Sequence, residues 1–355
     1  MSDDFHLLLS SYGQQVLRVA EEMSPSERDF LVFFQTLSKL YPPYLARKAL
    51  EIAILRTEAR AKFPFADHLY FTRPALEQAS SWVVSNYRTA RFSEYQRVVD
   101  LGCSIGGDTM AFAQAAEVIG IDYDLQRLVY AQANLSAIEL NERVHFVRAD
   151  LSQSLPIAGD SRSTALFFDP ARRHDGRRMF SVYDYHPPLS TVNNWLPDYP
   201  AIGVKLSPGV DRGELESFQE GEVEFISLAG SLKEAVLWLG PLYSTRWRAT
   251  VLPGPFSLVA EPGANCPFYE PLEYVYEPDP AVLRAKLVKT LAVQLDAGML
   301  DPDIAYLTAH EKVDTPFARI WEVEDWLPFN LKRLRSYLRE RHIGNITVKK
   351  RGSPI

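Results

Sequence analysis

The first 88 residues carry hydrophobic side chains at helical spacing. Phe5, Leu8, Tyr12, Val16 and Val19 recur every three or four positions, which places them on one face of a helix. Ser24-Pro25-Ser26-Glu27 has the form of a capping box and predicts that a second helix begins there. Further apolar stripes predict helices over 44–60 and 74–87, and we expect all these stripes, including Phe30 to Leu37, to form a core.

From residue 97 the pattern changes to short apolar runs that alternate with helical stretches. Five strands are predicted, over 98–101, 118–122, 144–147, 165–168 and 201–206. Buried strands that alternate with helices indicate βαβ units and a parallel sheet with helices on both faces. Later runs have shorter connections, so we expect antiparallel strands that complete the sheet or add a hairpin, over 223–228, 235–239, 246–252 and 256–260.

A proline-rich stretch begins near residue 261 and predicts a linker. Beyond it we expect strand (272–276), helix (280–297), strand (304–307), strand (317–323), helix (328–341) and strand (345–350). This β-α-β-β-α-β order is ferredoxin-like. The sequence therefore predicts an α/β protein with a helical N-terminal domain (1–88), a Rossmann-like domain (89–260) and a ferredoxin-like α+β domain (261–355).

Composition removes several classes of protein. Of the 355 residues, 46% are hydrophobic and 23% charged, as in globular proteins. No apolar run reaches the ~18–20 residues that cross a membrane, and the acidic start does not resemble a signal peptide. Two cysteines, Cys103 and Cys266, exclude a cysteine-rich zinc site or disulfide scaffold, and we expect a cytoplasmic protein without metal. The net charge of −7 argues against coating nucleic acid by bulk charge but leaves room for a local basic face.

A glycine loop follows the first predicted strand and opens a helix. Its pattern is Asp100-x-Gly102-x-x-x-Gly106-Gly107, and Asp122 ends the next strand 20 residues after Gly102. Asp150 and Asp169 end the third and fourth strands, so four carboxylates face the crevice where open α/β sheets bind ligands. The spacing differs from the G-x-G-x-x-G of dinucleotide oxidoreductases. Carboxylates at Asp100 and Asp108 would repel pyrophosphate and suit a cationic ligand with an amino-acid head.

The strings VVDLGCSIGGDTMAFA, VIGIDYD, FVRADLSQ and LFFDPARR resemble the class I S-adenosylmethionine-dependent methyltransferases. Within that class, KFPFADHLYFTRPALEQAS, DPARR, KLSPG and VKKRG resemble a bacterial group with a C-terminal THUMP-like domain, and the glycine loop distantly resembles that of trimethylguanosine synthases. The resemblance implies S-adenosylmethionine as cofactor. It implies that the Asp100–Gly107 loop, with Gly102, Ser104, Gly106 and Gly107, holds the methionyl part, Asp122 the ribose and Asp150 the adenine amino group.

Asp169-Pro170-Ala171-Arg172 stands where amino-methyltransferases carry a D/N-P-P-aromatic string. Ala171 and Arg172 depart from that string, so nitrogen as the acceptor atom, and stacking of a base on Arg172, stay open. We expect Asp169 to orient the acceptor or take its proton, and Arg172 to position the substrate or pair with Asp169. Carbon methylation through a thiolate is disfavoured, because Cys103 lies in the cofactor loop and Cys266 in the linker.

Several other residues are candidates for binding the acceptor. Arg173 belongs to a loop that is rich in arginine. Tyr185 and His186 are candidates to line the acceptor pocket. Lys205 is a candidate to lie at the border of this pocket or to contact a phosphate group. The segment from Leu331 to Arg351 contains eight Lys or Arg residues, including Arg335 and Arg339, and only one acidic residue. The THUMP-like resemblance implies that this region contacts RNA.

The favoured hypothesis is methyl transfer to an RNA base or cap-like nucleotide. The alternatives are a small-molecule methyltransferase with a helical lid and a non-catalytic S-adenosylmethionine-binding protein.

Overall fold

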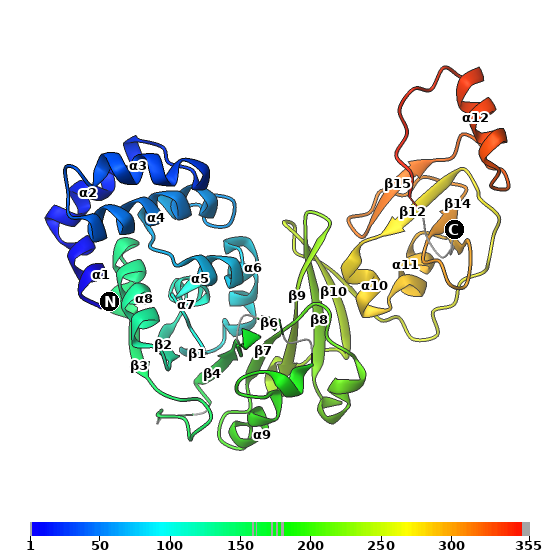
Figure 1. Cartoon of the computed structure of the whole chain (residues 1–355). Coiled ribbons are helices and arrows are strands. Elements are labelled where there is room, and N and C mark those ends of the chain that lie inside the picture. The colour runs from blue at the N-terminus through cyan, green and yellow to red at the C-terminus, as the bar shows by residue number, and fades with distance from the viewer. Residues whose placement is uncertain are drawn as a thin grey trace. The chain divides into compact units, whose positions relative to one another are not determined.

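The computed structural model describes residues 2–157, 160, 162–171, 173–174, 177–178 and 181–349 (Figure 1). The chain divides into two compact units. The first comprises Met1–Glu222 with Glu234–Arg246, and the second comprises Val223–Lys233 with Trp247–Ile355.

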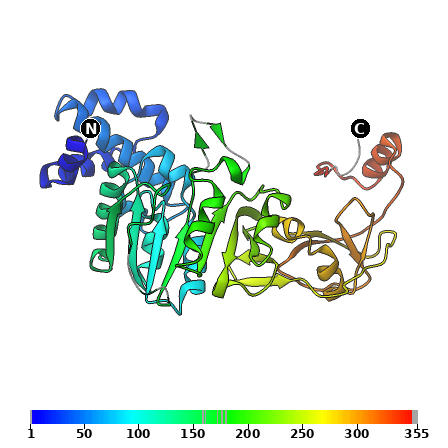
Figure 2. The same ribbon diagram turned by 90° about the horizontal axis from the view of Figure 1, so that it is seen from below.

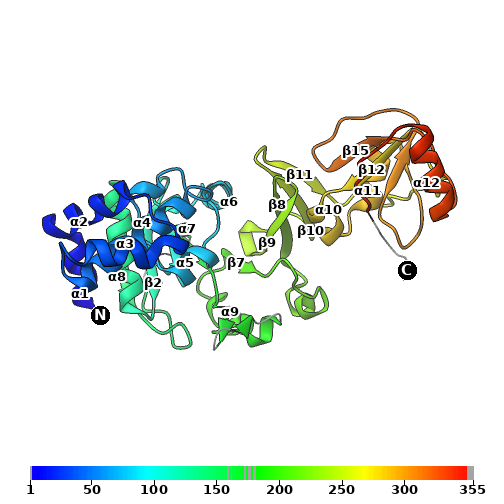
Figure 3. The same cartoon turned by 45° about the horizontal axis from the view of Figure 1, so that its top comes forward.

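The N-terminal part of the first unit is helical, as predicted, and its helices gather in one group (Figure 3). They are α1 (Ser2–Leu9), α2 (Ser11–Glu22), α3 (Phe30–Leu37), α4 (Pro43–Ala59), α5 (Arg73–Gln78) and α6 (Trp82–Thr89). The predicted first helix is divided by the N-cap Ser10, whose hydroxyl accepts a hydrogen bond from the Gly13 N–H. The predicted capping box is wrong, because Ser24 has a φ of +49° and a short 3-10 turn over Glu27–Asp29 precedes α3.

The helices differ in how much of their apolar surface is buried. Most of α4 is buried, so this helix forms the centre of the group. On α3, by contrast, only Leu37 of the predicted face is buried, Leu31 is 70% exposed, and Phe30, Phe33 and Phe34 are half-buried. The expectation that every apolar stripe would enter the core is therefore wrong for α3.

The predicted Rossmann-like sheet forms in the first unit (Figure 2). Its strands are β1 (Arg97–Leu101), β2 (Glu117–Asp122), β3 (Val144–Arg148), β4 (Thr164–Phe168), β7 (Ile202–Leu206) and most of β9 (Ser231–Leu239). Their order is β9-β7-β4-β1-β2-β3; β9 is antiparallel to β7, and the others are parallel. The connections contain α7 (Gly107–Phe112), α8 (Leu125–Ala137), α9 (Val192–Trp195) and the short pair β5 (Arg173–His174) and β6 (Arg177–Arg178).

The first strands of the second unit differ from expectation. They are most of β8 (Glu222–Leu228), β10 (Trp247–Leu252) and β11 (Phe256–Val259). β10 pairs with β8 in parallel, against expectation, whereas β10 and β11 form an antiparallel hairpin and β9 is antiparallel to β7, as expected. The physical reason is that the chain between β8 and β10 includes β9, and this long crossover lets β10 run in the same direction as β8.

The rest of the second unit contains a small antiparallel sheet in the order β13-β14-β12-β15. Its elements are β12 (Tyr274–Pro278), α10 (Pro280–Ala285), α11 (Val288–Gln294), β13 (Gly298–Met299), β14 (Leu307–Ala309), β15 (Ala318–Glu322) and α12 (Leu331–Glu340). β14 lies between β12 and β13, so the β-α-β unit is split, as in ferredoxin-like folds. The described element order differs from the expected β-α-β-β-α-β, because three strands lie between α11 and α12 and no strand follows α12.

Three details of this C-terminal prediction need correction. The expected helix over 280–297 is divided at Lys286, which has a φ of +59°. β13 was not predicted. The expected last strand is wrong in its described part, because residues 345–349 form no strand; residue 350 lies outside the described residues.

Candidate active site

The glycine loop follows β1 and ends where α7 begins at Gly107. Gly102 and Gly106 have φ values of +86° and +84°, in the left-handed region that favours glycine. A Cβ atom at Gly102 would lie 2.5 Å from the carbonyl oxygen of Asp169, the residue that follows β4. Gly102 therefore permits close contact between the loop and the end of β4.

Asp122 ends β2 and faces this loop. Its Oδ2 accepts a hydrogen bond from the Ser104 N–H at 3.0 Å, and its Oδ1 accepts one from the Asp124 N–H at 2.9 Å. The side chain is almost fully buried, and burial raises its pKa, although the two backbone hydrogen bonds oppose the shift. Asp122 is thus fixed beside the loop, at the predicted place.

Asp100 lies at the centre of the site and is fully buried. Its Oδ2 accepts a hydrogen bond from the Thr109 hydroxyl at 2.5 Å. Burial, together with the neighbouring Asp108 carboxylate, raises the pKa of Asp100 to about 8. At neutral pH the side chain therefore holds a proton most of the time.

Asp108 is ionised and internally paired. Burial would raise its pKa, but the nearby Arg88 and Lys205 outweigh burial and lower it. Arg88 Nη2 lies 2.5 Å from Asp108 Oδ1. The charge of Asp108 is therefore compensated inside the protein, so its predicted repulsion of pyrophosphate does not hold.

Asp169 lies at the carboxyl end of β4, next to the glycine loop. Its N–H donates to the Leu101 carbonyl oxygen at 2.9 Å. Lys205, in β7, donates from Nζ to Asp169 Oδ2 at 2.7 Å. The Asp169 side chain is 25% exposed, whereas that of Lys205 is only 3% exposed. Lys205 is buried against Asp169, which does not fit its predicted contact with phosphate.

Of the two residues predicted to line the acceptor pocket, His186 lies beside the Asp169-Pro170-Ala171-Arg172 string, whereas Tyr185 is buried. Pro170 is buried, and Ala171 pairs with His186 through two backbone hydrogen bonds of 3.0 and 3.1 Å. This bridge places His186, which is exposed, beside the string. Tyr185 is buried, and its hydroxyl accepts a hydrogen bond from the Ser207 N–H at 3.1 Å. Tyr185 is therefore bound to the residue that follows β7 and is not exposed for contact with a substrate.

Three other predicted residues are exposed or lie wholly or partly outside the described residues. Asp150 is exposed after β3, and its Oδ1 accepts a hydrogen bond from the Ser152 N–H, which lowers its pKa. Arg172 lies outside the described residues. Arg173 is described only by its backbone, in β5.

Sequence reasoning missed Arg88, on α6, which is fully buried beside the site. Its Nε lies 3.2 Å from Glu234 Oε1 on β9, and its guanidinium lies over the Phe167 ring at 4.6 Å. Burial would lower the pKa of Arg88, but Asp108 and Glu234 outweigh burial and raise it. The only signal in the sequence was a basic residue on the apolar side of a helix.

Asn134, on α8, was also missed. Its side-chain amide donates to the carbonyl oxygens of Tyr70 and Ile105, at 3.1 and 3.0 Å, and its Oδ1 accepts from the Tyr70 N–H at 2.7 Å. Ile105 belongs to the glycine loop, and Tyr70 to the segment between α4 and α5. A single buried amide therefore joins the upstream segment to the loop.

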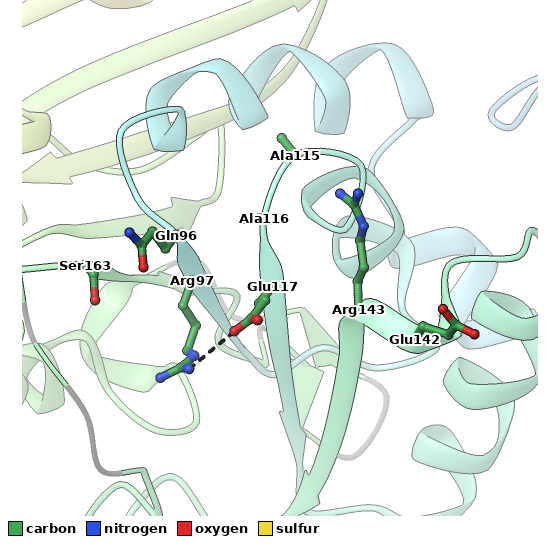
Figure 4. A pocket seen from close by; sticks show the side chains of 8 residues that line it. All are labelled: Gln96, Arg97, Ala115, Ala116, Glu117, Glu142, Arg143 and Ser163. Atoms are coloured by element: carbon green, nitrogen blue, oxygen red, sulfur yellow. Dashed lines mark hydrogen bonds and ion pairs between the residues drawn. The ribbon is translucent and has the colours of Figure 1, made fainter.

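A cavity of about 490 Å³ lies at the amino ends of β1 to β3, at the other end of the strands from Asp122 and Asp169 (Figure 4). It is lined by Arg97 and Glu117, the first residues of β1 and β2, and by Arg143 just before β3. Arg97 and Glu117 form an ion pair at 3.3 Å. Because Asp122 and Asp169 lie at or just beyond the carboxyl ends of strands, this cavity is separate from the candidate site.

Basic side chains also gather on α12, in the second unit. This helix has no buried residue and stands apart from the strands β12 to β15 (Figures 1 and 2). Lys332, Arg335 and Arg339 are exposed and recur at spacings of three and four, so they share one face. Lys349, by contrast, pairs with Glu277. Lys350 and Arg351, which belong to the predicted basic cluster, lie outside the described residues.

The described residues contain neither a helix that could span a membrane nor a group of metal ligands. No helix in the described residues is long and apolar enough to span a membrane. In the same part of the chain, no three His, Cys, Asp or Glu side chains are grouped so that they would hold a metal ion.

The chain is similar to known methyltransferases. Residues 95–172 match the family model "RNA cap guanine-N2 methyltransferase", and residues 318–355 match the model "THUMP domain-like". An uncharacterized S-adenosylmethionine-dependent methyltransferase of Mycobacterium tuberculosis, found in two strains, is 33% identical over 290 residues, which are 80% of this chain and 78% of that protein. A crystal structure described as a methyltransferase from Porphyromonas gingivalis W83 is 26% identical, with a TM-score of 0.72 over 89% of this chain and 87% of that one.

Proposed function

The chain belongs to the S-adenosylmethionine-dependent methyltransferases, and from that premise we propose that it methylates RNA. S-adenosylmethionine is its cofactor.

We assign the cofactor to the crevice between the glycine loop and Asp122. The left-handed backbone at Gly102 and Gly106 turns the loop tightly between β1 and α7, at the carboxyl end of β1, where open α/β sheets bind ligands. The Asp122 carboxylate is fixed by two backbone N–H groups and keeps lone pairs for the ribose hydroxyls. Ser104 and Gly107 complete the loop, and the exposed Asp150 is left for the adenine amino group.

When bound, S-adenosylmethionine supplies an electrophilic methyl group. The protein then has to hold the acceptor in line with that group, and little acid–base help is needed. Asp169 is the proposed orienting group, because it lies beside the glycine loop with its carboxylate partly exposed. His186 is held beside it by the backbone bridge to Ala171.

The observation that carries the RNA proposal is the exposed basic face of α12. Lys332, Arg335 and Arg339 project from a helix with no buried residue, in the region that matches the THUMP-like model. Trp326 and Phe329, just before α12, are 52% and 71% exposed. Basic side chains that bind phosphates, with aromatic rings on which bases stack, are typical of surfaces that bind single-stranded nucleic acid.

The test compares two double charge reversals. Arg335→Glu with Arg339→Glu changes the proposed RNA surface, and Arg28→Glu with Lys39→Glu makes the same change in net charge at exposed sites of the helical group. The probe is total RNA from cells that lack the gene. We expect only the first variant to bind this RNA more weakly, with a salt dependence flatter by about 1.4–1.8 in log–log slope. Equal behaviour of the two variants would contradict the proposal.

Methyl transfer is measured on the same RNA with radiolabelled S-adenosylmethionine. Wild type should label the RNA, and the α12 variant should lose labelling while calorimetry shows unchanged cofactor binding. A wild-type protein that labels no RNA, but labels a small-molecule extract of the same cells, would instead favour a small-molecule methyltransferase.

A further inference from the structure

We infer that Lys205 is a positioning residue, which holds the Asp169 carboxylate with one oxygen presented to the acceptor. This inference rests on the proposed role of Asp169 in orienting the acceptor. It departs from the sequence-based expectation that Lys205 itself touches the substrate.

The sheet places the two residues side by side. Phe168 at the end of β4 pairs with Val204 of β7 in parallel register, so Asp169 and Lys205 are the next residue on each chain segment. Neighbouring strands are ~4.8 Å apart, and the Lys205 Nζ to Asp169 Oδ2 distance is 2.7 Å. The ion pair therefore follows from backbone register as well as from side-chain reach.

Burial makes Asp169 the principal partner of Lys205. A buried ammonium group is costly unless it is paired and hydrogen-bonded. Lys205 Nζ lies 3.9 Å from Asp108 Oδ2, but Asp108 is much closer to Arg88, at 2.5 Å. Arg88 also lies beside Glu234. Within the described residues, Arg88 is thus shared between Asp108 and Glu234, and Lys205 makes its shortest ion pair with Asp169.

The consequence concerns the chemical class of the acceptor. Lys205 occupies Oδ2 of Asp169, and the side chain is still 25% exposed. The exposed part of an ionised carboxylate only accepts hydrogen bonds. An acceptor group that contacts this part would donate an N–H or O–H to it, which favours an amine or hydroxyl as the acceptor.

The first test needs no acceptor. Unfolding free energies are measured for wild type, Lys205→Met, Asp169→Asn and the double variant, as a double-mutant cycle. We expect the effects to be coupled by at least tenfold in the unfolding equilibrium constant, equivalent to about 1.4 kcal/mol. Additive effects would overturn the ion pair on which the inference depends. If Lys205→Met does not fold, Lys205→Gln, which keeps a polar end, replaces it in the cycle.

The second test measures single-turnover methyl transfer to total RNA from cells that lack the gene. Lys205→Met should reduce the rate at saturation at least 100-fold, with the apparent KM for RNA and the Kd for S-adenosylmethionine within twofold of wild type. The rate at saturation of Lys205→Arg should be at least tenfold higher than that of Lys205→Met. Lys39→Met, at an exposed lysine, is the control and should change none of these quantities.

The outcomes separate the two proposals. A raised KM with an unchanged rate at saturation would show that Lys205 binds the acceptor, and would overturn the inference. No recovery with arginine would also overturn it. If wild type labels no RNA, the proposed acceptor is wrong, whereas the double-mutant cycle still decides whether Lys205 and Asp169 act as a pair.

Discussion

Gly102→Ala should lower the free energy of unfolding more than the same change at Gly107, five residues away in the same loop. At Gly102 the backbone has a φ of +86°, and left-handed backbone costs an L residue roughly 1–2 kcal/mol. The new methyl group would also lie 2.5 Å from the Asp169 carbonyl oxygen, which is backbone and must move. Such overpacking typically costs about 1–3 kcal/mol.

The expected loss for Gly102→Ala is therefore about 2–5 kcal/mol of unfolding free energy. At Gly107 no positive φ is present, and an added Cβ would meet its nearest atoms, in Ala79 and Phe63, at 3.8 and 3.9 Å. These are ordinary contacts. Because Gly107 begins α7, alanine there should be neutral or stabilise by up to about 1 kcal/mol.

Urea denaturation of the three proteins, followed by circular dichroism, gives the unfolding free energies. Calorimetry with S-adenosylmethionine then shows whether the displaced Asp169 backbone also disturbs the cofactor site, in which case Gly102→Ala binds at least tenfold more weakly. If Gly102→Ala is as stable as wild type to within about 0.5 kcal/mol, or if the two alanine variants lose the same stability, the argument from left-handed backbone and close contact is refuted.

Two further predictions concern carboxylates of the site. Asp122→Ala should weaken S-adenosylmethionine binding by about 1.5–3 kcal/mol, the usual value of hydrogen bonds to a charged group, and unchanged binding in calorimetry would contradict its assignment to the ribose. Asp100 has a pKa of about 8 in the folded protein, above its unfolded value, so the folded state keeps a proton that the unfolded chain releases between about pH 4 and 8. Its contribution to the unfolding free energy should fall as pH rises through this window, and Asp100→Asn should remove that part of the pH dependence in urea titrations; an identical pH dependence in both proteins would contradict the shift.

The sequence predicted the strands of the sheet and the position of the glycine loop, because both depend on local patterns. Apolar runs marked β1 to β4, and the left-handed turns at Gly102 and Gly106 had to be made by permissive residues. Asp100, Asp122 and Asp169 could be placed at the carboxyl ends of β1, β2 and β4 because each follows or ends an apolar run, while their roles in binding stay predictions.

The ion pairs around Arg88 were not predictable in the same way. Its partners Asp108 and Glu234 are 20 and 146 positions away, on α7 and β9, and no local pattern indicates which buried charges compensate each other. The same holds for Lys205, whose partner became clear only from the register of β4 and β7. The parallel pairing of β10 with β8 likewise depends on a long-range crossover rather than on the strands' own residues.

The three hydrogen bonds of Asn134 bear on whether the sheet could exist without the helices that precede it. A truncation that began after residue 88 would leave this buried amide with only its Ile105 partner, and would leave Asp108 and Glu234 without Arg88. Each orphaned buried polar group costs about 1–3 kcal/mol, and charged groups more. Limited proteolysis should therefore not release an autonomous catalytic fragment at that point, and grafting of the sheet onto another protein would have to carry the upstream helices with it.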